Sequence, residues 1–147
     1  MDIEKIKKIA KEEEKDIVSF LREIISIESK SGNEEAVAKR IAKEMEDVGM
    51  DEVYIDDVGS VIGRIGNGRK KILYDSHIDT VGVSSSWKFD PYKGKVENGR
   101  IYGLGASDNK GGMASMVYGA KIINKARIEF DGTLYIAGVV QEEDCEG

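Results

Sequence analysis

Cysteine, histidine and proline are each represented by a single residue in this chain of 147 amino acids. The lone cysteine, Cys145, excludes an internal disulfide, and a reducing cytoplasm is the simpler interpretation. The lone histidine, His77, excludes any mechanism that draws two histidines from this chain. Long apolar runs are also missing: none approaches the roughly 20 residues that a membrane helix needs, and the charged N-terminus lacks the apolar core of a signal peptide. We therefore expect a cytoplasmic protein without a membrane partner.

Basic residues are outnumbered, 22 against 28 acidic ones, which gives a formal net charge of −6. This balance argues against nucleic acid as a partner, because phosphate binding needs concentrated lysine and arginine. Hydrophobic residues make up 40% of the chain, which is typical of a globular protein, and the length suits one domain.

The first 58 residues are rich in charge and hold only two of the 17 glycines, Gly32 and Gly49. Apolar residues recur at helical spacing over 3–25 and over 37–45, which predicts helices. The segment 31–33 interrupts the pattern and offers a cap for the second helix, which Gly49 is expected to end.

After residue 50 the apolar period shifts toward two, which predicts short strands. They fall at 53–55, 61–65, 72–74, 95–102 (a hairpin) and 133–140 (a central strand). Asn98 and Gly99 suit the tight turn of the hairpin, and a further helical face runs over 109–125. Helices that alternate with buried strands predict an α/β fold with three layers, α/β/α, around a mixed central sheet.

Three polar clusters follow these elements. They are His77 with Asp79, Asp108 at the start of a helix, and Glu142 with Glu143 after the central strand. Taken singly, each has an ordinary explanation: a hydrogen-bonded histidine, a helix N-cap, and two solvated glutamates. Taken together they favour a ligand site, because ligands of open α/β sheets gather at the carboxyl ends of strands.

The residue types in these clusters suit a metal. Imidazole and carboxylate are the usual nitrogen and oxygen ligands of zinc, and a further carboxylate can bridge two metals. In the His-x-Asp spacing, Asp79 can accept a hydrogen bond from the second ring nitrogen of His77 and so fix its tautomer. Adjacent glutamates at a strand end point in different directions, so one can bind metal while the other acts as a general base.

Ordered motifs carry a family resemblance: LYDSHIDTV at 73–81, GRIYGLGASDNKGG at 99–112, and the Glu142-Glu143 pair, with Trp87 and 90–91 between them. From about residue 17 onward, the chain resembles the catalytic half of a zinc metallopeptidase family. That family includes aminoacylase, carboxypeptidase G2, acetylornithine deacetylase and succinyl-diaminopimelate desuccinylase. The motifs are most similar to those of a hydrolase branch associated with selenium metabolism.

The resemblance implies a zinc exopeptidase-like fold of the phosphorylase/hydrolase type, with two Zn²⁺ ions that Co²⁺ or Mn²⁺ can replace. It makes His77 a ligand of one zinc and Asp79 the residue that orients it. Asp108 corresponds to the carboxylate that bridges the metals, Glu143 to a ligand of the second zinc, and Glu142 to the general base. A cis peptide after Asp108 also belongs to the family pattern.

The sequence covers only part of that family pattern. The family draws another carboxylate ligand and a final histidine from segments beyond the glutamate pair. It also carries an inserted domain for dimerisation and substrate closure. We therefore expect residues 1–147 to be the N-terminal portion of the catalytic domain of a longer, homodimeric enzyme, and to be inactive alone. Among the other residues, Arg100 and Lys110 are expected to be structural charges, Trp87 and Tyr92 to pack a loop, and Cys145 to be partly buried.

The function expected from this resemblance is a two-zinc hydrolase of amide bonds in peptides or N-acyl amino acids. A rival from another class is a non-catalytic binding or assembly protein on the same scaffold, which has no need of a base at Glu142. A magnesium- or manganese-dependent phosphatase is disfavoured because the sequence has no second basic cluster for phosphate.

Overall fold

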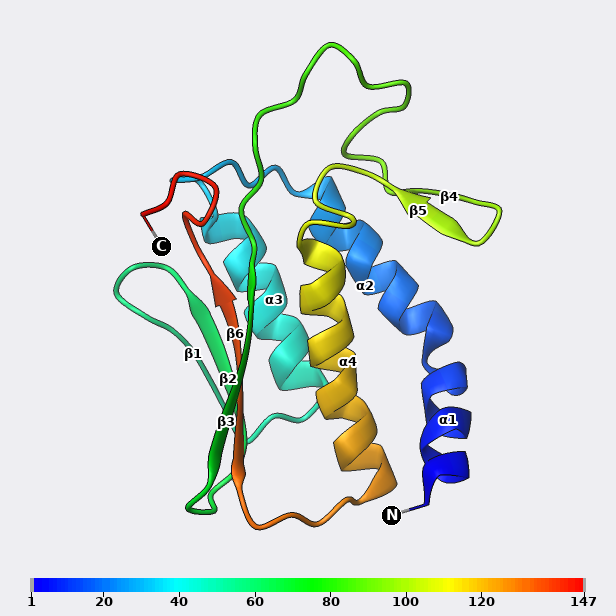
Figure 1. The fold of residues 1–147 in the computed structure, drawn as a ribbon, viewed down its shortest axis with the longest axis vertical. Coiled ribbons are helices and arrows are strands. Elements are labelled where there is room, and N and C mark those ends of the chain that lie inside the picture. Colours follow the sequence, from blue (N-terminus) through cyan, green and yellow to red (C-terminus); the bar gives the residue numbers. More distant parts are fainter. Residues whose placement is uncertain (1, 147) are drawn as a thin grey trace.

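The computed structural model describes residues 2–146 as a mixed α/β fold (Figure 1). In chain order the elements are α1 (Ile3–Glu12), α2 (Glu14–Ser26), α3 (Glu35–Asp47), β1 (Glu52–Ile55), β2 (Val61–Gly66), β3 (Lys71–His77), β4 (Lys95–Glu97), β5 (Arg100–Tyr102), α4 (Lys110–Ala126) and β6 (Thr133–Val139). None of these helices combines the length and the apolar character that crossing a membrane requires.

The main sheet has the strand order β1-β2-β6-β3. β1 pairs with β2 and β2 pairs with β6 in antiparallel fashion, whereas β3 and β6 are parallel. Parallel neighbours need a long crossover, and α4 lies in the connection from β3 to β6. The predicted mixed sheet and the central position of the strand at 133–140 are therefore confirmed.

All four helices lie on one face of this sheet (Figure 1). Within residues 2–146 no helix covers the opposite face, where Tyr54 is 46% exposed and Leu73 is 60% exposed. The α/β class is confirmed, and the described residues contain one of the two helical layers of the predicted three-layer architecture.

The core lies between the helices and the sheet, where the predicted apolar stripes meet. Burying a large aliphatic side chain typically contributes about 1.5–3 kcal/mol to folding, so these stripes are the main source of stability. The buried members include Phe20 and Ile24 of α2, Val37, Ile41 and Met45 of α3, Met113 and Val117 of α4, Val61 of β2 and Ile136 of β6.

The local signals are confirmed at two turns and corrected at two helix ends. Asn98 and Gly99 take φ angles of 52° and 72° in the β4–β5 turn, and Gly49, with φ 83°, follows α3. The helical pattern over 3–25 is split at Glu13, whose buried carboxylate pairs with Lys121 and Lys125 of α4. The N-cap of α3 is Glu34, without a side-chain bond, so the segment 31–33 does not cap this helix as predicted.

Candidate metal centre

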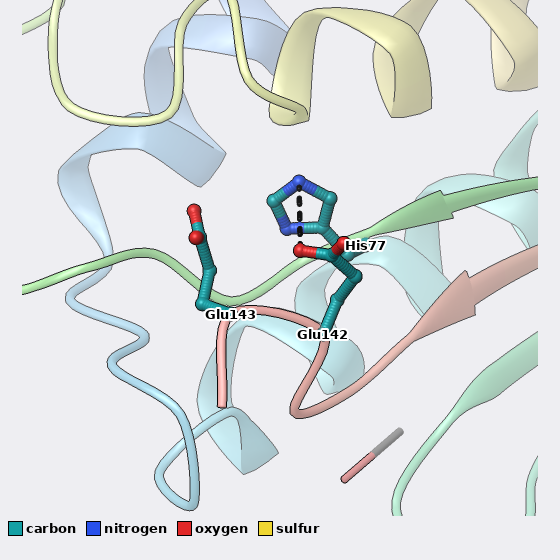
Figure 2. Close-up of side chains that lie close together, drawn as sticks. All are labelled: His77, Glu142 and Glu143. Atoms are coloured by element: carbon teal, nitrogen blue, oxygen red, sulfur yellow. Dashed lines mark ion pairs between the residues drawn. The ribbon is translucent and has the colours of Figure 1, made fainter. Parts of the chain in front are cut away.

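The predicted site residues come from three places along the chain. His77 is the last residue of β3, and Asp79 lies two positions further on. Glu142 and Glu143 lie in the turn after β6, and Asp108 lies two residues before the start of α4, next to its N-cap Asn109. Because β3 and β6 are parallel, their carboxyl ends meet at one edge of the sheet, and Figure 2 shows His77, Glu142 and Glu143 close together there.

His77 is held at both ring nitrogens. Its Nδ1 lies 3.1 Å from the backbone oxygen of Asp79 and 3.4 Å from Oδ1 of the same residue. Its Nε2 lies 2.9 Å from Oδ1 of Asp108. The same nitrogen lies 3.9 Å from Oε2 of Glu142, the ion pair that Figure 2 marks with a dashed line. The ring is nearly buried, with 7% of the residue exposed, and its orientation is fixed in advance of any ligand.

The ionisation of His77 reflects these contacts. Burial lowers the pKa of the imidazole, but the hydrogen bond to Asp108, the bond to the Asp79 carbonyl and the nearby negative charges outweigh it. The pKa is therefore raised above its usual value. The ring sits in surroundings that favour positive charge, as a cation site requires.

Asp79 is fully buried and does more than face the imidazole. Its Oδ2 accepts hydrogen bonds from the hydroxyl of Ser31 at 2.7 Å and from the backbone N–H of Glu143 at 3.1 Å. Its Oδ1 accepts from the backbone N–H of Glu142 at 3.3 Å. One carboxylate thus joins the end of β3, the loop before α3 and the turn after β6.

The same hydrogen bonds keep Asp79 ionised. Burial by itself would raise the pKa of this carboxyl, but the bonds from Ser31 and from the amides of Glu143 and Glu142 lower it below its usual value. A carboxylate surrounded by donors in this way is anchored as an anion. Asp79 consequently holds the backbone of both glutamates in place.

Asp108 is positioned by the residues that follow it. The peptide between Asp108 and Asn109 is cis, as the family pattern implies. The hydroxyl of Ser76 donates to the carbonyl of Asn109 at 2.8 Å, which links this turn to β3. The Asp108 side chain is 82% exposed, so its free oxygen faces the open side of the site.

Lys110 ties the first turn of α4 to the end of α2. Its Nζ donates to the carbonyls of Ile24 and Ile27, at 2.8 and 2.9 Å, at the end of α2. The residue is 1% exposed, and burial lowers the pKa of its ammonium group to about 8. It has the structural role expected for it, in a buried position that the sequence did not indicate.

Donor atoms of His77, Glu142 and Glu143 all lie within 4.8 Å of one another. An imidazole nitrogen and carboxylate oxygens form a set that zinc accepts, and a cation would balance the clustered negative charge. Asp108 lies outside this three-residue set but contacts the same Nε2 of His77. The donor chemistry therefore fits a divalent metal.

Sequence reasoning missed the two serines that support the site. Ser76 carried a signal, since it directly precedes His77 at the end of a strand, whereas Ser31 is distant in sequence and had none. Cys145 was expected to be partly buried and is exposed, so that prediction was wrong. Trp87, in the loop before β4, is 36% exposed.

Comparisons with known proteins extend this description. The chain is 49% identical over 140 residues to the uncharacterized protein YgeY of Escherichia coli, covering 94% of this chain and 35% of that protein. It is 37% identical over 126 residues to a putative LysW-lysine/LysW-ornithine hydrolase of Pyrococcus furiosus, covering 86% and 34%. The chain thus spans about a third of the length of these relatives.

Among solved structures, an M20 family metallo-carboxypeptidase of Sulfolobus solfataricus superposes with a TM-score of 0.76 at 26% identity. The match covers 90% of this chain and 31% of that one. The model of peptidase family M20/M25/M40 matches residues 73–147, just over half of the chain, and includes every one of the five predicted site residues. On these grounds the chain belongs to peptidase family M20/M25/M40.

Proposed function

We propose that this chain provides part of the active site of a metal-dependent hydrolase of amide bonds. The complete site holds two zinc ions and acts on peptides or N-acyl amino acids. Family membership supports the reaction class, and the relatives from P. furiosus and S. solfataricus are described as a hydrolase and a metallo-carboxypeptidase.

One observation carries the proposal. The side chains of His77, Glu142 and Glu143 converge from two parallel strands, and Asp108 reaches the same histidine nitrogen from a third segment. We assign His77, Asp108 and Glu143 as metal ligands. The remaining donors, the inserted dimerisation domain and the rest of the catalytic domain are proposed to come from residues beyond 147 in a longer protein.

Zinc, when bound, acts as a Lewis acid that lowers the pKa of water toward about 7. The chain's own residues have separate tasks. Glu142, whose side chain is 58% exposed at the site, is placed to take a proton from the attacking water and return it to the leaving nitrogen. Asp79 holds the imidazole of His77 and the backbone of both glutamates in register.

The test uses a chimaera in which residues 1–147 replace the corresponding segment of E. coli YgeY. We expect this protein to bind zinc and to hydrolyse N-acyl amino acids, but not phosphate esters. Glu142→Gln should abolish turnover, whereas Asp144→Asn, a matched change at an exposed carboxylate two residues away, should leave it intact. A folded, zinc-loaded chimaera that binds N-acyl amino acids without hydrolysing them would instead support the binding-scaffold alternative.

A further inference from the structure

The turn after β6 is bound to two buried carboxylates through its backbone. Asp79 accepts hydrogen bonds from the N–H groups of Glu142 and Glu143. The N–H group just before them, that of Gln141, donates to Oε1 of Glu34 at 3.1 Å. Three consecutive amides of one turn therefore each donate to a carboxylate. One of these carboxylates follows β3, and the other stands at the start of α3.

The side chain of Glu34 serves this turn and not its own helix. Glu34 is the N-cap residue of α3, but its carboxylate makes no capping bond to that helix. The residue is only 6% exposed, and a buried carboxylate is costly unless it accepts hydrogen bonds. Val37 and Ala38, in the first turn of α3, are buried in the core, which fixes this end of the helix by packing. Glu34 is thus an acceptor held on a well-packed element.

Gln141 has a conformation that needs such a contact. Its φ angle is 60°, in the left-handed region that residues other than glycine rarely adopt. Only Val140 lies between it and the last residue of β6, so the conformation at 141 sets the direction in which the chain leaves the sheet. The carbonyl of Gln141 accepts from the N–H of Glu146 at 3.1 Å, which closes the turn. A strained conformation persists only where its surroundings enforce it.

The two bonds to Asp79 constrain this turn only after its left-handed residue. They join Asp79 to Glu142 at 3.3 Å and to Glu143 at 3.1 Å, long for N–H···O bonds, which usually measure about 2.7–3.2 Å. Neither bond acts on Gln141 itself. A change of φ at Gln141 would therefore move both glutamates away from His77, beside which they lie in Figure 2.

We propose that Glu34 is a positioning residue for the metal centre. By accepting the N–H of Gln141, it fixes the left-handed turn that brings both glutamates to His77. This inference rests on the proposed function, in which one of these glutamates binds metal and the other is the base. Glu34 acts through a single hydrogen bond, so the place of its acceptor oxygen matters and its charge is not required.

Two substitutions separate position from charge. Glu34→Asp keeps the charge, but its carboxylate is one methylene too short to reach Gln141. Asp is also a preferred N-cap residue, so α3 itself should not be weakened. Glu34→Gln loses the charge but keeps a carbonyl oxygen in the same place. If Glu34 served only to begin α3, Glu34→Asp would be the milder of the two changes. We expect the opposite order.

The first measurement is hydrogen exchange of the metal-free YgeY chimaera, resolved to single amides. In Glu34→Asp, the amides of residues 141–143 should exchange about tenfold faster or more, because the Gln141 amide loses its acceptor and the turn relaxes. Glu34→Gln should keep the slow exchange. Glu44→Asp is the matched control, since Glu44 is a buried glutamate of the same helix that accepts from the hydroxyl of Tyr118. It should leave residues 141–143 unchanged, whatever its effect on overall stability.

The second measurement is zinc titration of the same variants. Zinc affinity should fall about 10–100-fold in Glu34→Asp and stay near that of the wild type in Glu34→Gln and Glu44→Asp. Unchanged exchange or unchanged zinc affinity in Glu34→Asp would overturn the proposal. An equally large loss in Glu34→Gln would also overturn it, because charge and not position would then be decisive.

These measurements do not depend on turnover, so they separate this inference from the proposed function. A chimaera that shows the expected differences in exchange and zinc affinity, yet hydrolyses no amide, would refute the proposed function and support the role of Glu34. Full hydrolase activity with identical exchange and zinc affinity in wild type and Glu34→Asp would do the reverse.

Discussion

The backbone N–H of Glu143 donates a hydrogen bond to Oδ2 of Asp79 across 3.1 Å, although 64 residues separate the two along the chain. The bond connects the segment that follows β3 to the turn that follows β6. The orientation of the proposed zinc ligand Glu143 is therefore tied to the residue that also contacts His77.

Changing Asp79 should affect metal binding without removing a ligand. In the YgeY chimaera, we expect His77→Ala to lose zinc and Asp79→Asn to retain it with about 10–100-fold lower affinity. In the wild type, the Asp79 carboxylate accepts hydrogen bonds from backbone N–H groups. The Asn side chain would turn an N–H₂ group toward one of these donors, so the free energy of unfolding should fall by about 1–3 kcal/mol. Zinc titration and urea unfolding measure the two effects, with exposed Asp57→Asn as control. Equal zinc affinity in wild type and His77→Ala would disprove the ligand assignment.

Substitutions of the two glutamates should have different effects in the same chimaera. Glu142→Gln keeps the shape of the side chain but cannot accept a proton, so turnover should fall about 10²–10⁴-fold with the metal content unchanged. Glu143→Gln should lower the metal content, because an amide is a poorer zinc ligand than a carboxylate, and added zinc should partly rescue it. Activity assays with metal analysis check both. Loss of zinc from Glu142→Gln alone would mean that the two roles are exchanged.

Lys110 should make the free energy of unfolding depend on pH in the alkaline range. Its pKa is about 8 in the folded chain, against 10.5 for an ordinary lysine, so between these values the unfolded state binds more protons. The free energy of unfolding should therefore rise with pH in this window, by at most about 1.4 kcal/mol per pH unit. Urea unfolding between pH 8 and 10 measures the slope. It should disappear in Lys110→Met and persist in Lys11→Met, a change at an exposed lysine.

The 147-residue chain alone should bind zinc weakly and show no hydrolase activity. His77, Asp108 and Glu143 are fewer donors than a two-metal site needs. Calorimetric zinc titration and an assay with N-acyl amino acids test this. Steady turnover by the purified, zinc-loaded chain would show that these residues suffice.

Much of the fold was accessible from sequence because its signals are local. The stripe of Val37, Ile41 and Met45 predicts a helix buried on one face, and Asn98-Gly99 predicts a hairpin turn; both are present. The segment 31–33 was predicted to cap a helix, whereas the hydroxyl of its first residue, Ser31, donates to Asp79. A local sequence pattern contains no information about a buried acceptor 48 residues away. The pairing of Glu13 with two lysines of α4 was missed for the same reason.

The residue types of the site could be predicted from the sequence, but the hydrogen bonds that hold these residues in place could not. Chemical type and strand-end position singled out His77, Asp108 and the glutamates. The backbone bonds from Glu142 and Glu143 to Asp79 depend on the parallel pairing of β3 with β6, which no spacing in the sequence specifies.

The parallel pairing of β3 with β6 also bears on when the site forms during folding. The two strands are joined through the whole length of α4, so their contact closes a long loop and is expected to be a slow step. His77 and Glu143 meet only after that step, and a metal held by both binds the native topology and not its precursors. Zinc should therefore act mainly by slowing unfolding, with each tenfold rise in free zinc above its dissociation constant adding about 1.4 kcal/mol to stability.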